Sequence, residues 1–411
     1  MSTSHTQFSK DFFELVKAIG ECRTKQEEDR IILNEVRNLK AGMSAKDVQM
    51  KRMREYLIRM IYVEMLGHDA SFGHIQGIKL VSSRNLLEKR IGYLSVELTL
   101  HKDHEFMLLL VNGFQTDLRS DNFLEVSMAL GAVAKLVNTD IIPAVLPLVV
   151  NLLDHQQSLI RKKAVMCLHR FHQLDPHVLV PLGDKVKKAL CDVDPAVMGA
   201  SLILLTDLVK ANPVDYKDLV PSLLSILKQI IEHRLPRDFD YHRIPAPWIQ
   251  MDLLRLLALL GHNDKNASSL MHQVLADVIR RAAIGTNIGY AIVYECVRTV
   301  TTIYPNPALL DAAAQAISHF LTSPNHNLKY LGVTSLAAIV KIDPKHAVEH
   351  QLVVVDCLED DDETLRRRTL DLLCAMTNPE NVVPIVAKLA GHLRTTTDAY
   401  MRGALVSRIS E

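Results

Sequence analysis

The side chains of this sequence most suited to metal binding or catalysis are its 18 histidines and six cysteines. Their spacing does not match that of a known metal or catalytic site. His169 and His172 lie three apart on a predicted helix, which would suit a metal, but Arg170 and Gln173 beside them supply no further ligand. The cysteines are scattered without a CxxC pair, which favours a reducing compartment over disulfides or zinc. No GxSxG, HExxH or P-loop motif is present. We therefore expect no catalysis, no metal and no cofactor.

Three basic clusters remain as candidate binding groups. Residues 161–163 and 366–368 each open a predicted helix, where such charges are usually solvated or paired with acids of the preceding repeat. The acidic run 360–363 just before the second cluster is expected to cap that helix. The third cluster lies near the N-terminus and could contact anionic lipid headgroups, although an ordinary solvated face is the alternative. Its residues are Lys51, Arg52, Arg54 and Tyr56.

Composition limits the class of protein. Lys plus Arg and Asp plus Glu number 47 each, so the net charge gives no reason to expect nucleic-acid binding. The first residues lack the apolar core of a signal peptide. The longest apolar stretch, 141–153, contains two prolines and is shorter than the roughly 20 residues of a membrane helix. We expect a cytosolic chain with at most peripheral membrane contact.

An internal repeat predicts the fold. Apolar residues recur at steps of 4, 4 and 3, as in Ile160, Ala164, Leu168 and Phe171, and this spacing puts them on one helical face. The repeat begins at Ile160, Val197, Ile249, Ile288, Leu328 and Leu365, with steps of 37, 52, 39, 40 and 37 residues. A period near 40 residues predicts an all-α, right-handed α-solenoid of HEAT/armadillo-like helical repeats. The one long step contains residues 234–248, whose three prolines predict an extended insertion in a single continuous solenoid over 1–411.

The segment 55–94 carries a family resemblance. It contains Leu66-Gly67-His68, then Phe72-Gly73-His74, then Lys89-Arg90-Ile91-Gly92-Tyr93-Leu94. This order resembles the N-terminal trunk of the large subunits of clathrin-adaptor-type complexes, the adaptins of the gamma, alpha, delta and epsilon class. The resemblance continues in colinear order to the segment 354–373, and details such as RLPRDFDYH (234–242) look most like the epsilon type.

The resemblance implies a non-catalytic subunit of a heterotetrameric vesicle-coat adaptor complex, which sorts cargo and forms vesicles at the trans-Golgi network. The implied partners are a sigma small subunit, a beta-class large subunit, a mu medium subunit and an Arf-family GTPase. A HEAT-repeat scaffold of another class, phosphatase-scaffold or importin-like, is the alternative. Family members are longer than 411 residues, so we expect a truncated form in which the hinge and ear domains are absent.

The resemblance also assigns residues. Gamma-type trunks meet the GTPase at positions that match Ile75, Ile78 and Leu109, which would otherwise be read as core aliphatics. Alpha-type trunks carry a lysine run ending in tyrosine that matches residues 53–56, and Glu55 reverses its charge, so we expect weak phosphoinositide affinity. The N-terminal segment 13–36 is expected to pack on sigma. Gly20 stands where gamma and alpha subunits have an arginine, which predicts weak recognition of acidic dileucine signals.

Overall fold

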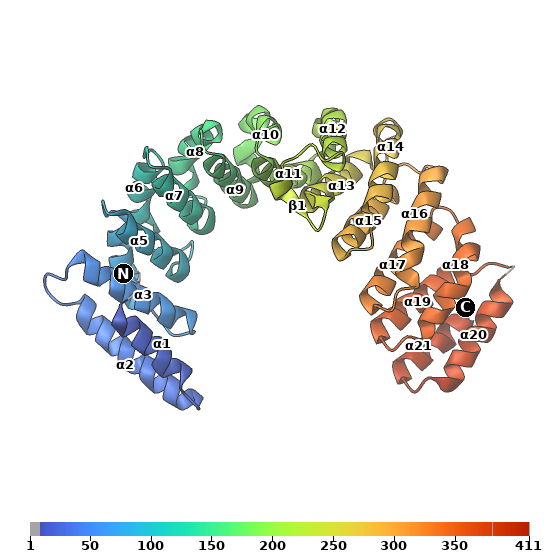
Figure 1. Cartoon of the computed structure of the whole chain (residues 1–411), viewed down its shortest axis with the longest axis horizontal. Coiled ribbons are helices and arrows are strands. Elements are labelled where there is room, and N and C mark those ends of the chain that lie inside the picture. The colour runs from blue at the N-terminus through green and yellow to red at the C-terminus, as the bar shows by residue number, and fades with distance from the viewer. Residues whose placement is uncertain (1–8, 380, 411) are drawn as a thin grey trace, which may run out of the picture. The chain divides into compact units, whose positions relative to one another are not determined.

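The computed structural model describes residues 9–379 and 381–410. Within these residues the chain forms twenty-one α-helices, several short 3₁₀ turns and one hairpin of two very short strands (Figure 1). The all-α fold class predicted from the repeat is confirmed.

The chain divides into two compact units, one ending at Leu204 and the other beginning at Leu205, within α11. The prediction of one continuous array over 1–411 stays a prediction, and the units are described separately. The helices before the boundary are α1 (Lys10–Gly20), α2 (Lys25–Met43), α3 (Met50–Met65), α4 (His74–Val81), α5 (Leu86–Thr99), α6 (Met107–Asp117), α7 (Phe123–Leu136), α8 (Ile142–Asn151), α9 (Ser158–Leu174) and α10 (Gly183–Leu190), followed by α11 (Pro195–Ala211) across it.

The second unit contains the longest connection between successive α-helices, residues 232–246. Its helices are α12 (Val220–Ile231), α13 (Pro247–Gly261), α14 (Lys265–Ala282), α15 (Asn287–Val300), α16 (Pro307–Leu321), α17 (His326–Val340), α18 (Lys345–Asp356), α19 (Glu363–Met376), α20 (Val382–Thr395) and α21 (Ala399–Ser410).

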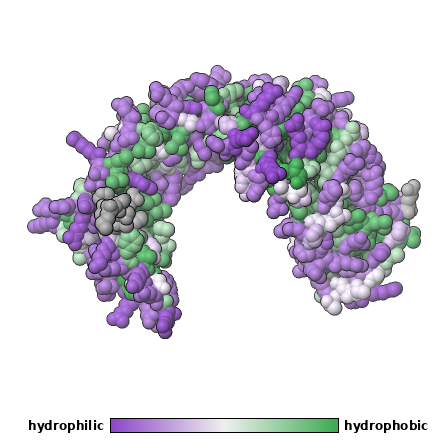
Figure 2. Space-filling model, viewed as in Figure 1, coloured by the Kyte–Doolittle hydropathy of each residue, from purple (hydrophilic) through white to green (hydrophobic). Residues whose placement is uncertain are grey.

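In both units alternate helices pack side by side in two layers. In the first unit α3, α5, α7 and α9 contact one another in order, and α4, α6 and α8 form the other layer. In the second unit α13, α15, α17 and α19 form one layer, and α12, α14, α16 and α18 form the other. Each helix pair thus covers the apolar face of the next pair, which is the packing of an α-solenoid. Figure 2 shows hydrophilic residues over most of the visible surface, with smaller hydrophobic areas among them.

The repeat positions found in the sequence fall on the odd-numbered helices from α9 to α19. On α9 the four side chains Ile160, Ala164, Leu168 and Phe171 are all buried, and the corresponding four residues of α19 are buried too. Helix α13 buries its equivalent leucines completely. The steps of 4, 4 and 3 therefore mark the core-facing stripe, as predicted.

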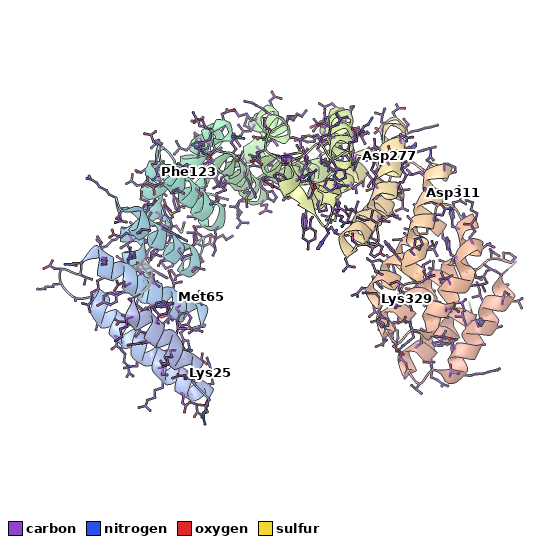
Figure 3. All side chains as sticks on the ribbon, in the orientation of Figure 1. Lys25, Met65, Phe123, Asp277, Asp311 and Lys329 are labelled. Carbon is purple, nitrogen blue, oxygen red and sulfur yellow. The ribbon has the colours of Figure 1, made fainter. Side chains whose placement is uncertain are left out.

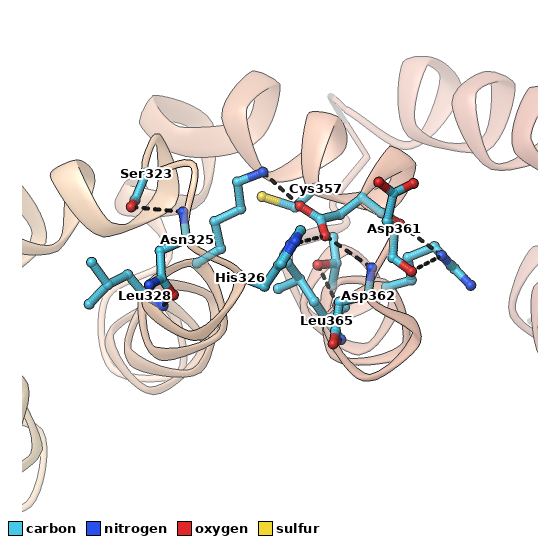
Figure 4. Close-up of polar contacts among 12 residues, drawn as sticks. Ser323, Asn325, His326, Leu328, Cys357, Asp361, Asp362 and Leu365 are labelled. Carbon is cyan, nitrogen blue, oxygen red and sulfur yellow. Dashed lines mark hydrogen bonds and ion pairs between the residues drawn. The ribbon is translucent and has the colours of Figure 1, made fainter.

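Polar contacts join successive repeats. Lys163 Nζ on α9 donates to the Ser127 carbonyl oxygen of α7 at 2.7 Å, and Cys167 Sγ lies 3.1 Å from the Leu130 carbonyl oxygen. In the second unit Lys329, labelled in Figure 3, and His326 both donate to Asp360, from Nζ and Nδ1 respectively, each at 2.6 Å (Figure 4). The basic residues at the helix starts therefore serve the fold.

The first basic cluster is mainly structural. Arg161 forms a two-pronged ion pair with Asp192, with nitrogen–oxygen distances of 2.7 and 2.8 Å. We predicted a solvated residue or a pair with an acid of the preceding repeat, but Asp192 lies in the loop after α10, which follows α9 in the sequence. The predicted partner of Arg161 was therefore wrong. The predicted acidic cap is also confirmed, because the Asp362 side chain accepts from the backbone N–H of Leu365 at 2.7 Å at the start of α19.

The predicted insertion forms a hairpin. Strand β1 (Asp240–Tyr241) pairs antiparallel with β2 (Ile244–Pro245), and the hairpin lies beside the start of α13 (Figure 1). Pro245 and Pro247 prevent a continuous helix here. The sequence predicted an extended connection but did not indicate the tight hairpin turn.

Candidate interaction surfaces

The glycines of the motif 55–94 let three helices pack closely. Gly67 has a φ of 86° and ends α3, a conformation that glycine adopts without the cost that a Cβ imposes. Gly92 on α5 faces α4 so closely that a Cβ would lie 2.5 Å from the Val81 backbone nitrogen. The order of these residues in the sequence is therefore a packing requirement of α3, α4 and α5.

A buried charged network holds α5 against α6 and α7. Lys89 Nζ lies 2.5 Å from Asp117 Oδ1, and the Tyr93 hydroxyl donates to Asp117 Oδ2 at 2.6 Å. Lys89 is 6% exposed and Asp117 is 2% exposed, and Glu125 Oε1 lies 3.4 Å from the same lysine. Burial, with the Asp117 carboxylate as second cause, raises the pKa of Tyr93, so the phenol keeps its proton and can donate. Sequence reasoning missed Asp117, because no local pattern joins residues 28 positions apart.

This framework sets which side chains of α4 and α6 reach solvent. Helix α4 buries His74, Gly77 and Leu80 and turns Ile75 outward, so that Ile75 is 38% exposed while Ile78 is half-buried. Helix α6 contacts α4. On α6, Leu109 is 57% exposed and Leu108 is more exposed still.

The three GTPase-contact candidates thus lie on two contacting helices, two of them exposed and one half-buried. We name Ile75, Ile78, Leu108 and Leu109 the α4–α6 patch. Full burial would have removed these candidates, and the structure does not bury them. Their role in GTPase contact stays a prediction.

The four lipid-contact candidates have different environments. Lys51 and Arg52 are exposed, Arg54 is half-buried, and Tyr56 is only 9% exposed. Tyr56 packs in the core cluster of α2 and α3, and its hydroxyl accepts from Arg52 Nε at 2.8 Å. Tyr56 is therefore placed to orient Arg52 more than to meet a lipid through its ring.

A small cavity of about 230 Å³ brings Lys51, Arg52 and Tyr56 together, and Arg54 is not part of its lining. Asp11 and Glu55 line the same cavity. Arg59 adds a third basic group to the lining, and the two carboxylates offset most of this positive charge. The weak phosphoinositide affinity expected from the sequence stays a prediction.

Helices α1 and α2 carry several exposed apolar side chains. Phe13 and Val16 of α1 and Leu33 of α2 are exposed, and the two helices contact one another. Gly20 is the last residue of α1, and no atom lies within 4 Å of the position where a Cβ would be. A larger residue therefore fits at this position.

The described residues contain neither a cluster of metal ligands nor a membrane-spanning helix. No group of three or more His, Cys, Asp or Glu side chains among them is arranged to hold a metal ion. None of their helices combines the length and the apolar character needed to cross a membrane.

The fold and these surfaces define a helical-repeat scaffold whose candidate sites are exposed faces of packed helices. The sequence matches the adaptin N-terminal region family over residues 28–411. It is 52% identical over 403 residues to the AP-4 complex subunit epsilon of Arabidopsis thaliana, covering 98% of this chain and 43% of that protein. It is 44% identical over 410 residues to the AP-4 complex subunit epsilon-1 of Homo sapiens, covering 100% of this chain and 36% of that protein.

The chain belongs to the adaptin family, and within it to the epsilon type. It spans about two fifths of the length of these curated relatives. A solved-structure comparison finds a chain of a homology model of the full-length AP-3 complex in an intermediate open conformation, with a TM-score of 0.60 and 21% identity. That match covers 86% of this chain and 59% of the other, and it supports the α-solenoid fold alone.

Proposed function

We propose that this chain is the trunk of an epsilon-type large subunit of a heterotetrameric vesicle-coat adaptor, and that it acts as a scaffold without catalysis. The observation that carries the proposal is family membership along nearly the whole chain, from residue 28 to 411. It favours this function over the phosphatase-scaffold and importin-like alternatives. The proposed partners are a sigma small subunit, a beta-class large subunit and a mu medium subunit.

We assign to sigma the surface of α1 and α2 that carries the exposed side chains of Phe13, Val16 and Leu33. Exposed Phe13 and Leu33 would be buried by a partner, and the burial of such side chains contributes about 1.5–3 kcal/mol each. Co-expression of the chain with sigma, followed by affinity capture, tests the assignment. Phe13→Glu and Leu33→Glu should each reduce sigma capture strongly.

The matched control is Leu352→Glu on α18, because Leu352 is equally apolar and 80% exposed in the other unit. It should leave sigma capture unchanged. Equal loss in all three variants would reject the α1–α2 surface, and failure of the unmodified chain to capture any of the three subunits would reject the adaptor function itself.

The proposal also includes the membrane to which the complex is recruited. We place the complex on the cytosolic face of trans-Golgi network membranes, as a peripheral protein recruited by a GTP-loaded Arf-family GTPase. The α4–α6 patch supports this, since it exposes large apolar side chains on two contacting helices and apolar side chains form the buried centre of docking surfaces. Exposed Ile75 and Leu109 provide the test.

In liposome recruitment with the assembled complex, Ile75→Glu and Leu109→Glu should each abolish the GTP-dependent fraction. Leu352→Glu again serves as the control and should behave as the unmodified chain. Unchanged GTP-dependent recruitment in both patch variants would show that the GTPase binds elsewhere.

A further inference from the structure

The hairpin in residues 234–248 is held in a strained conformation. Its two-residue turn consists of His242 and Arg243, with φ values of 48° and 69°. Hairpin turns with positive φ at both central residues strongly favour Asn-Gly, because other side chains clash with the backbone there. Ala246 just after the hairpin, with φ of 37°, and His233 before it, with φ of 58°, are left-handed as well.

Local contacts fix this conformation. The backbone N–H of Ala246 donates to the Phe239 carbonyl oxygen at 3.0 Å. The buried side chain of Gln250 on α13 donates through Nε2 to the Pro245 carbonyl oxygen at 2.6 Å. Strained residues that their surroundings hold in place cluster at functional sites. The surroundings of His242 and Arg243 are therefore a candidate functional site.

Both residues line a cavity of about 640 Å³, which lies between the hairpin turn and the C-terminal ends of α12 and α14. Three arginines, Arg243, Arg280 and Arg281, supply positive charge to its lining, which contains no Asp or Glu. The other polar side chains of the lining are His233, His242, Gln250 and Thr286.

Only part of this positive charge is compensated. Arg280 pairs with Asp277 on its own helix at 2.6 Å, and Arg281 donates to the Ile231 carbonyl oxygen at 2.6 Å, which leaves its charge unpaired. Arg243 has no acidic partner within the described residues. By contrast, Arg161 in the first unit is fully engaged by Asp192.

We propose that this cavity binds a small polyanion that carries several phosphate groups on a polyol, such as an inositol phosphate. Guanidinium groups present planar pairs of donors that match phosphate oxygens, and the two histidines add ring N–H donors. The volume is within the range of small-molecule sites and far exceeds that of a single phosphate. The headgroup can be free in solution or part of a lipid.

The chain contains its own reporter for this site. Trp248 is its single tryptophan, and it is 55% exposed. Its ring lies 5.1 Å from that of Tyr241, whose ring lies 4.3 Å from His242 in the turn. Occupation of the cavity should therefore change the tryptophan fluorescence.

The test is a fluorescence titration of the full chain with inositol hexakisphosphate, with inorganic phosphate in parallel. We expect saturable binding of the hexakisphosphate, at least tenfold tighter than that of inorganic phosphate, equivalent to about 1.4 kcal/mol.

His242→Asn combined with Arg243→Gly gives the turn its favoured residues, so the double variant should melt no lower than the unmodified chain while its affinity falls at least tenfold. Arg280→Gln, on a separate element, should also weaken binding, and it tests the site even where the turn variant changes folding.

The matched control is Arg237→Ala, since Arg237 is an exposed arginine of the same insertion outside the cavity lining. Arg237→Ala should bind the hexakisphosphate within about twofold of the unmodified chain, a difference of only about 0.4 kcal/mol.

Vesicles with and without phosphatidylinositol bisphosphate distinguish a lipid headgroup from a soluble ligand. Arg243-dependent pelleting supports a lipid-borne headgroup, and hexakisphosphate binding without pelleting supports a soluble one. The proposal is overturned if neither probe binds, if binding persists in both cavity variants, or if only phosphorylated peptides bind.

Discussion

The buried ion pair between Lys89 and Asp117 allows a sharp test of how this trunk is stabilised. In Lys89→Met, an apolar stem is kept and the ammonium is removed. The Asp117 carboxylate, which is 2% exposed, then keeps the hydrogen bond from the Tyr93 hydroxyl but loses its positively charged partner. Removing one partner of a buried pair costs about 3–5 kcal/mol, because the other charge is left uncompensated. We expect a loss of that size for the local stability of α5–α7.

An ion pair on the protein surface provides the comparison. Lys188 Nζ lies 2.7 Å from Asp154 Oδ1, nearly the distance of the buried pair, but the two side chains are 76% and 61% exposed. Exposed pairs contribute about 0–1 kcal/mol, so Lys188→Met should change stability by less than about 1 kcal/mol. Distance alone would rank the two substitutions as equal, and burial ranks them far apart.

Two further variants separate charge from packing. Tyr93→Phe removes one hydrogen bond to a carboxylate and should cost about 1.5–3 kcal/mol. Lys89→Met combined with Asp117→Leu removes both members of the most buried pair and should recover part of the loss, because paired apolar replacements of a buried ion pair are often close to neutral. The recovery is not complete, since Glu125 loses the lysine and the Tyr93 hydroxyl loses its acceptor.

Hydrogen exchange of the α5–α7 amides is the suitable assay, because a repeat array opens in local units. Lys89→Met should accelerate exchange in these helices, and Lys188→Met should not accelerate exchange in α10. Equal, small effects of the two single lysine variants would refute the reasoning, as would a double variant less stable than Lys89→Met.

Three other predictions concern binding and pH. With sigma bound, the chain should bind an acidic dileucine peptide weakly, and Gly20→Arg should raise the affinity because the position has open space; tight, acid-dependent binding by the unmodified chain would contradict this. Liposome pelleting should show weak phosphoinositide dependence at the N-terminal cluster, and strong dependence lost in Arg54→Glu would overturn that expectation. Burial and the neighbouring His104 lower the pKa of His74, so the unfolded chain binds the proton more readily and stability should fall as the pH drops through about 6.5, by at most about 1.4 kcal/mol per pH unit for this group. His74→Gln should lessen the drop in melting temperature between pH 7.5 and 5.5, and an unchanged drop would contradict this role.

Periodic burial was readable from the sequence, because a helix that packs on one side repeats its core residues at fixed steps. The 4, 4, 3 spacing was enough to predict the burial of the four positions from Ile160 to Phe171. The prolines of 234–248 were enough to predict a break between helices, because proline has no backbone N–H to donate within a helix. The candidate α4–α6 patch came from a family resemblance, and the structure supplied the exposures that separate Ile75 from half-buried Ile78.

Features that depend on pairs of distant residues were not readable. Lys89 and Asp117 meet because α5 and α6 pack, and a lysine at a helix start carries no mark of its partner. Tyr56 could have faced lipid or core, and only the contact with α2 decides for the core. Likewise, the His242–Arg243 turn uses residues that no turn rule would place there.

The motif around α4 shows why packing and binding must be considered together in this chain. Gly77, on the buried face of α4, lies so close to α5 that a Cβ there would be 2.8 Å from Ser95 Oγ, and Gly92 brings the α5 backbone against α4 in the same way. That approach fixes the rotation of α4 and thereby decides that Ile75 points to solvent. A substitution of Gly77 would therefore disturb the α4–α6 patch without touching it, whereas Ile75→Glu changes the patch and leaves the helix packing intact. If the patch is a docking surface, the two substitutions should abolish the same binding event, and only the first should also lower the stability of α4 and α5.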